Sequence, residues 1–135
     1  LKESVADESR WQALYPLASP GFSLLSGDDE TFVRAMIGGA HGVISVASNA
    51  VPATFARICR YVSEQNFDAA LALDGQLQEL YALLGAEPNP VPIKAIMKLL
   101  GFGRGLRLPL LSLSVDDPVA ADEMTDLYKT IDHSL

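Results

Sequence analysis

The sequence predicts an α/β fold, namely the C-terminal part of a (β/α)8 TIM barrel followed by a C-terminal helical domain. Short apolar runs alternate with longer helical patterns over residues 1–65, which indicates β/α units and a parallel sheet. From residue 66 onward the pattern is helical. About three strands are too few for a parallel sheet with both faces covered, and a closed barrel takes about 250 residues. We therefore expect residues 1–65 to be the last three β/α units and residues 66–135 to be the helical domain.

Three strand-and-helix pairs make up the first part. Buried strands are expected at "LKES" (1–4), "GFSLLSG" (21–27) and "GVISVASN" (42–49), which are apolar or rich in β-branched residues. Three helices are expected between and after them. The first starts at the N-cap Asp7 and kinks or ends at Pro16, the second covers 28–40, and the third starts near Pro52.

The second part contains three further helical segments. Apolar residues spaced by three, four and seven over 67–85 predict one amphipathic helix that ends at Gly85. A proline-rich stretch then leads into a helix from about Pro92 to Leu100. "GFGRGLRLPLLSLS" (101–114) is expected to be extended, and Asp117 is expected to cap a last helix.

Composition excludes several classes of function. The chain has 135 residues, 49% of them hydrophobic, and a net charge of −7. An acidic chain without a Lys/Arg cluster argues against binding to nucleic acid or to an anionic membrane. No apolar run approaches the roughly 20 residues of a membrane span. The single Cys59 favours a reducing compartment, so we expect a cytoplasmic globular protein.

Lys2 is the first candidate for chemistry. A lysine on a strand that points into an apolar barrel is disfavoured as a charged ammonium, which leaves a free amine able to form an imine with a ketone. Glu3 is expected to point to the opposite face. An exposed terminal lysine is the alternative interpretation, since most lysines are solvated.

Other polar motifs favour structural roles. Asp28 and Asp29 in "SGDDE" follow a strand and open a helix, where carboxylates are favoured by capping and by the helix dipole. Gly27, in the same motif, would allow a ligand to approach the backbone closely. His41, His133 and Cys59 do not have the spacing of a zinc site, and no metal is expected.

Five segments together resemble the dihydrodipicolinate synthase family. They are "LKES", "LLSGDDETF", "GAHGVISVASNAVP", "EPNPVPIKAIMKLLG" and "LRLPLLSLS", in the family's order and spacing across essentially the whole chain. The resemblance implies that "LKES" is the sixth strand of a barrel. We therefore expect the part of the barrel that precedes it to be missing here.

The resemblance also implies the site and the reaction. Lys2 matches the lysine that forms a Schiff base with pyruvate, while Ile44 and Gly27 match residues that line the same pocket. The enamine then attacks L-aspartate 4-semialdehyde, and cyclisation frees the lysine without any cofactor. The tyrosines, the threonine and the arginine that move protons and bind the aldehyde's carboxylate come from earlier strands. The family also implies a homo-oligomer, a tetramer or a dimer, in lysine biosynthesis.

Several alternatives stay open from the sequence. Sialic acid lyases and 2-keto-3-deoxy sugar-acid aldolases share the lysine and the barrel. "SGDDE", "VISV" and "RLPL" favour the synthase over these relatives. The chain could also be an inactive assembly fragment or part of a non-catalytic paralogue. We expect it to be inactive alone.

Overall fold

The computed structural model describes residues 1–103, and the expected extended segment at 101–114 and the helix after Asp117 lie wholly or mostly outside them. The described chain divides into two compact units, which we treat separately. Unit 1 comprises residues 1–46 and 55–75, and unit 2 includes residues 47–54 and the chain from Gln76 onward. The expected division after residue 65 concerns the complete barrel and stays a prediction.

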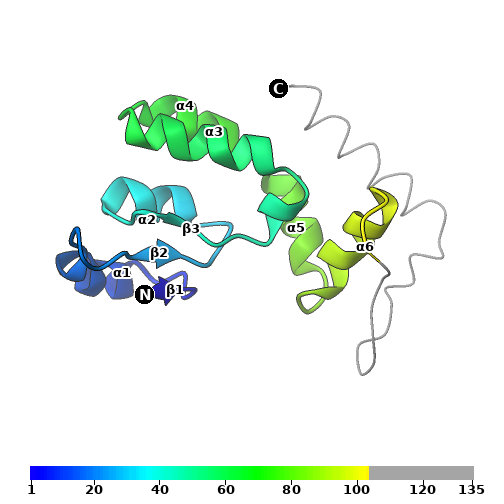
Figure 1. Ribbon diagram of the computed structural model, residues 1–135, viewed down its shortest axis with the longest axis horizontal. Helices are drawn as coiled ribbons and strands as arrows, with labels where there is room; N and C mark the ends of the chain where they lie inside the picture. Colours follow the sequence, from blue (N-terminus) through cyan, green and yellow to red (C-terminus); the bar gives the residue numbers. More distant parts are fainter. Residues whose placement is uncertain (104–135) are drawn as a thin grey trace. The chain divides into compact units, whose positions relative to one another are not determined.

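Unit 1 is built on a three-stranded parallel sheet in the order β1-β2-β3 (Figure 1). The strands are β1 (Lys2–Glu3), β2 (Leu25–Ser26) and β3 (Gly42–Val43). In this register Lys2 lies opposite Leu25, and Leu25 lies opposite Gly42. The expected parallel sheet with intervening helices is therefore present. Because the strands are parallel, their carboxyl ends lie at the same edge of the sheet.

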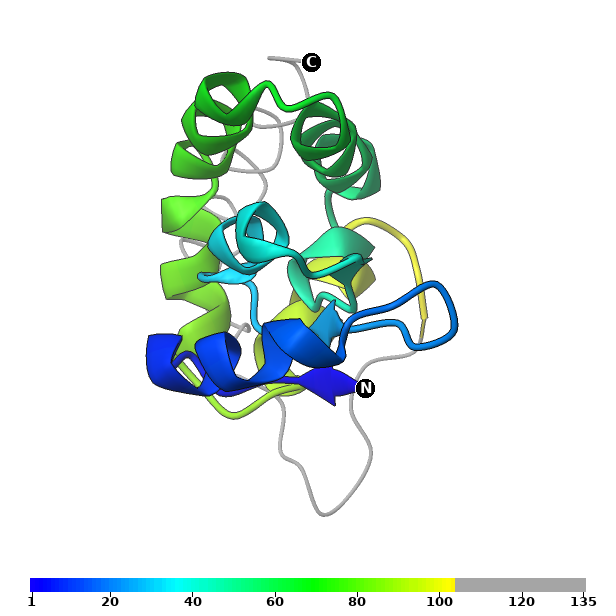
Figure 2. The ribbon, with the colours of Figure 1, turned by 90° about the vertical axis from the view of Figure 1, so that its left-hand side faces the viewer.

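The strands are shorter than the sequence predicted. The expected strand 21–27 is wrong in its first half, because Ser19 and Phe22 pair across a tight turn at Pro20 and Gly21. This turn belongs to the loop that leads into β2 (Figure 2). The expected strand 42–49 is wrong after Val43, since the chain turns into a 3₁₀ helix, η2 (Ala47–Asn49), before α3 (Pro52–Ser63). Proline at the start of α3 agrees with the prediction.

The first helix, α1 (Glu8–Leu14), begins as predicted. The Asp7 carboxylate accepts a hydrogen bond from the Ser9 N–H, and this satisfies a donor that the first turn leaves unpaired. The helix ends at Leu14, just before Pro16, so Pro16 ends the helix rather than kinking it and lies in a 3₁₀ turn, η1 (Tyr15–Leu17). Leu17, at the end of this turn, is exposed, whereas Trp11 and Leu14 of α1 are buried.

The second helix, α2 (Phe32–Gly38), starts four residues later than the expected 28–40 and ends at a pair of glycines. Gly39 has a φ of 127°, a backbone conformation that residues with a Cβ atom rarely adopt. Its N–H donates to the carbonyls of Ala35 and Met36. Gly38 is needed for a different reason, because the Tyr15 ring occupies the space where its side chain would be. This contact ties η1 to the end of α2.

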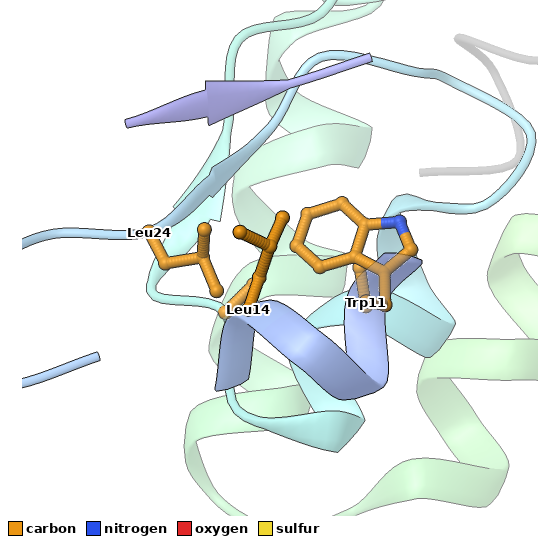
Figure 3. Close-up of a cluster of buried hydrophobic side chains, with 5 residues drawn as sticks. Trp11, Leu14 and Leu24 are labelled. Atoms are coloured by element: carbon orange, nitrogen blue, oxygen red, sulfur yellow. The ribbon is translucent and has the colours of Figure 1, made fainter. Parts of the chain in front are cut away.

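Helices α1 and α2 cover one face of the sheet through a small apolar cluster. Trp11 and Leu14 project from the same side of α1 toward Leu24, as Figure 3 shows. Ala35 and Ala40 complete the cluster, and Leu24 is fully buried within it. A fully buried leucine contributes about 1.5–3 kcal/mol through transfer from water alone.

Replacing Leu24 with alanine is expected to lower the free energy of unfolding by about 3 kcal/mol, because the cavity cost adds to the lost transfer energy. The matched control is Leu17→Ala. Leu17 is 53% exposed whereas Leu24 is 0% exposed, so the control should change stability by about 0.5 kcal/mol or less. Urea denaturation followed by circular dichroism measures both. Equal effects of the two substitutions would contradict this account of the core.

The expected single helix over 67–85 is two helices, α4 (Phe67–Gly75) and α5 (Gln78–Gly85). The break follows Gly75, where a glycine inside a helix costs about 1 kcal/mol relative to alanine. Leu77 becomes the N-cap of α5 and is fully buried. An unbroken helix would have had the same apolar spacing, so the sequence pattern does not predict the break. The break depends instead on how Leu77 packs in the folded chain.

Unit 2 has its own apolar core. The last described helix, α6 (Val91–Leu99), lies within one residue of its predicted bounds. Its buried face combines with α5 and η2, which it contacts. The buried apolar residues of this unit are Ala47, Ala50, Val51, Leu77, Leu80, Tyr81, Val91, Ile93 and Ile96. Over residues 1–103, no helix is both long enough and apolar enough to cross a bilayer.

Candidate functional site

The two faces of the sheet differ in what covers them. Glu3, Leu24 and Ser26 are buried and alternate with residues that point the other way. The Glu3 carboxylate accepts hydrogen bonds from Arg10 Nε on α1 at 2.7 Å and from the Val5 N–H at 3.0 Å. The hydrogen bond from Arg10 holds the pKa of Glu3 below its ordinary value. Glu3 is thus a structural acid that ties β1 to α1 on the helix-covered face.

Lys2 points to the opposite face, as strand alternation predicted. Its side chain is exposed and lies directly above Gly27, the residue that follows β2. A methyl group added at Gly27 would collide with Lys2 Cε and with Ser4 Oγ. The glycine therefore leaves open the path along which the lysine reaches the carboxyl end of β2.

Ile44 lies on this same open face but not within a strand, which corrects the sequence prediction. β3 ends at Val43, and the Ile44 N–H continues the ladder by donating to the Ser26 carbonyl at 2.8 Å. The register places Ile44 level with Gly27. Its side chain is 51% exposed, and it is not part of the apolar cluster that α1 and α2 form on the other face.

The acidic loop after β2 is held by its own hydrogen bonds. Asp28 Oδ2 accepts from the Thr31 hydroxyl at 2.6 Å and from the Thr31 N–H at 3.0 Å. Ser26 Oγ donates to the Asp28 carbonyl at 3.2 Å. Asp28 thus has the structural role predicted for it, since it fixes the entry into α2 next to Gly27.

The remaining reactive side chains of unit 1 lie elsewhere. The His41 Nδ1 accepts from the Leu24 N–H at 3.2 Å, so this histidine secures the loop before β3. Burial raises the pKa of the Cys59 thiol, which donates to Met36 Sδ at 3.8 Å and is therefore a poor nucleophile. Among the described residues, no group of His, Cys, Asp or Glu could hold a metal ion.

The open face thus brings together Lys2, Gly27 and Ile44, which the sequence had singled out, and one residue that it had not. Ser4 directly follows β1, two positions from Lys2, and faces the same way. Strand alternation alone could have pointed to it. This arrangement presents a primary amine at the carboxyl ends of parallel strands. Active sites of (β/α) barrels lie at these ends, and a primary amine there can act as a nucleophile.

Comparisons with known proteins agree on one family. The model of the dihydrodipicolinate synthetase family matches residues 1–130. The 4-hydroxy-tetrahydrodipicolinate synthase of Stenotrophomonas maltophilia is 44% identical over 124 residues, which are 92% of this chain and 42% of that protein. The chain thus spans about two fifths of the length of the curated relatives it matches.

Solved structures of similar proteins match the fold. The dihydrodipicolinate synthase of Aquifex aeolicus superposes with a TM-score of 0.84 at 32% identity, over 97% of this chain and 44% of that one. The chloride-inhibited synthase of Acinetobacter baumannii, solved in complex with pyruvate, gives a TM-score of 0.81 at 29% identity. That match covers 94% of this chain and 44% of the other.

Proposed function

Because this chain belongs to the dihydrodipicolinate synthetase family, we propose that it supplies the Schiff-base lysine of a 4-hydroxy-tetrahydrodipicolinate synthase. In this proposal residues 1–65 are the last three β/α units of a (β/α)8 barrel and residues 66–135 are its C-terminal helical domain. We use "complete enzyme" for this chain together with the rest of that barrel. The complete enzyme acts in the cytoplasm as a homo-oligomer, a tetramer or a dimer, in lysine biosynthesis.

The single observation that carries the proposal is the placement of Lys2. It reaches over Gly27 toward the carboxyl end of β2, on the sheet face that α1 and α2 leave open. Glu3, the nearest acid in the sequence, is on the other face and bonded to Arg10. The Lys2 amine is thus turned toward the interior of the proposed barrel without an adjacent carboxylate on its strand.

The reaction follows from amine chemistry at this position. The Lys2 amine attacks the keto carbon of pyruvate, and water leaves as the imine forms. The imine withdraws electrons, so the methyl group loses a proton and an enamine results. The enamine carbon attacks the aldehyde of L-aspartate 4-semialdehyde, whose oxygen takes a proton. Cyclisation through the amino group of that substrate then displaces Lys2 as a free amine. The imine itself is the electron sink, so the proposal requires no cofactor.

Product formation by the complete enzyme tests the proposal. Pyruvate and L-aspartate 4-semialdehyde should condense with a kcat/KM at least about a hundredfold above the kcat/KM for cleavage of sialic acid or a 2-keto-3-deoxy sugar acid. Substrate-specific polar contacts give selectivity of this order. Faster cleavage of a sugar acid would assign the chain to a sister aldolase. No imine with pyruvate at all would indicate a non-catalytic paralogue.

Gly27→Ala is expected to slow imine formation about tenfold to a hundredfold while leaving the fold intact. The added methyl group would push the Lys2 side chain off its path, and a displacement of about 1 Å can cost a hundredfold in rate. Borohydride trapping with pyruvate measures the rate. The control is Gly21→Ala, because nothing lies within 4 Å of the added methyl group there. Equal trapping in both variants would contradict the close approach of Lys2 to Gly27.

A further inference from the structure

Ser4 shares with Lys2 the space above Gly27. The Ser4 hydroxyl oxygen and Lys2 Cε both lie against the point where a Gly27 side chain would begin. The Lys2 nitrogen is one bond beyond Cε, so rotation about the Cδ–Cε bond can bring it within reach of the hydroxyl. The two side chains are thus neighbours on the open face, next to the carboxyl end of β2.

Both groups are without a partner within the described part of the chain. No hydrogen bond or ion pair joins either the Lys2 ammonium or the Ser4 hydroxyl to residues 1–103. The nearest carboxylate on the strand, Glu3, accepts from Arg10 on the opposite face and cannot hold Lys2. Ser4, which follows β1, is therefore the neighbouring polar side chain that lies on the same face as Lys2 and can orient it.

We propose that Ser4 is a positioning residue for the Lys2 amine, an inference that rests on the function proposed above. A neutral amine has two N–H groups and one lone pair, and a serine hydroxyl oxygen can accept one of those N–H groups. This hydrogen bond leaves the lone pair free to point at the keto carbon of pyruvate. No bond to Ser4 is made or broken, and the hydroxyl keeps its own proton throughout.

The hydroxyl matters because a lysine side chain is long and flexible. An amine on four methylene groups samples many rotamers, and attack requires a nearly fixed distance and direction to the carbonyl carbon. A hydrogen bond between neutral groups has a net effect of about two- to tenfold on an equilibrium or a rate. The expected contribution of Ser4 is therefore a modest change in rate, separable from the loss of Lys2 itself.

The test uses the complete enzyme with Ser4→Ala, Ser4→Thr and the control Ser63→Ala. Ser63 is an exposed serine of α3, whose hydroxyl donates to the Arg60 carbonyl. At saturating pyruvate, Ser4→Ala should slow imine formation about fivefold, as trapped by borohydride, with Tm unchanged. Ser4→Thr keeps the hydroxyl and should restore the rate, and Ser63→Ala should match the wild type.

Two results would overturn the inference. Imine formation in Ser4→Ala at the wild-type rate excludes a positioning role while leaving the proposed function intact. A slow Ser4→Thr variant with a lowered Tm would assign Ser4 to packing. Should Ser4→Ala fail to fold, Ser4→Cys retains the side-chain shape with a weaker acceptor and should be slow. Failure of the unaltered enzyme to form any imine would instead refute the proposed function itself.

Discussion

Lys2→Ala is expected to reduce turnover by the complete enzyme at least about a thousandfold, because it removes the atom that forms the covalent intermediate. Lys2→Arg should be equally inactive, since a guanidinium keeps its charge and has no nucleophilic lone pair at neutral pH. Reduction of the pyruvate imine with borohydride, followed by digestion and mass spectrometry, should place the adduct on Lys2. Both variants should lack the adduct.

The controls are two lysines of α6. Lys98 is exposed in the last turn of that helix and Lys94 is half-buried within it. Lys94→Ala and Lys98→Ala should keep the rate of imine trapping within about twofold of the wild type. An adduct mapped to Lys94 or Lys98, or substantial turnover in Lys2→Ala, would refute the assignment of the nucleophile.

The isolated 135-residue chain is expected to show no measurable condensation, at least about a thousandfold below the complete enzyme. Among the described residues, β1 and β3 each pair with one neighbouring strand only, so the sheet has two open edges. Lys2 and Ile44 are exposed on the face that would line the barrel. Without the rest of the barrel, water is not excluded, and the acids and bases that imine chemistry needs are not positioned.

Assays of the isolated chain beside size-exclusion chromatography measure this expectation. The open edges and exposed apolar side chains should make the chain aggregate, pair with a second copy or bind the remaining part of the barrel. Adding that remaining part should restore activity. Turnover comparable to the complete enzyme from a monodisperse 14.5 kDa monomer would refute the proposal that this chain needs the rest of the barrel for activity.

The local features of the fold were predictable because local chemistry determines them. Asp7 caps α1 through a hydrogen bond two residues away, and Pro52 starts α3 because it needs no donor there. Alternation along a strand likewise predicted that Lys2 and Glu3 point to opposite faces. The family was identified differently, from the resemblance of five short segments to its known members.

Tertiary structure decided what depends on contacts distant in sequence. The helical pattern over 67–85 did not show that the chain breaks after Gly75, because Leu77 is buried within unit 2, whose core includes residues distant in sequence. Ile44 lies just beyond the end of β3 but still bonds to β2, because the chain turns into η2 only after it. Gly27 became a neighbour of the Lys2 side chain only through the pairing of β1 with β2, 23 residues apart in register, whereas Ser4 shares that face by alternation. Sequence periodicity specifies which face a side chain takes, whereas strand register specifies which side chains share it.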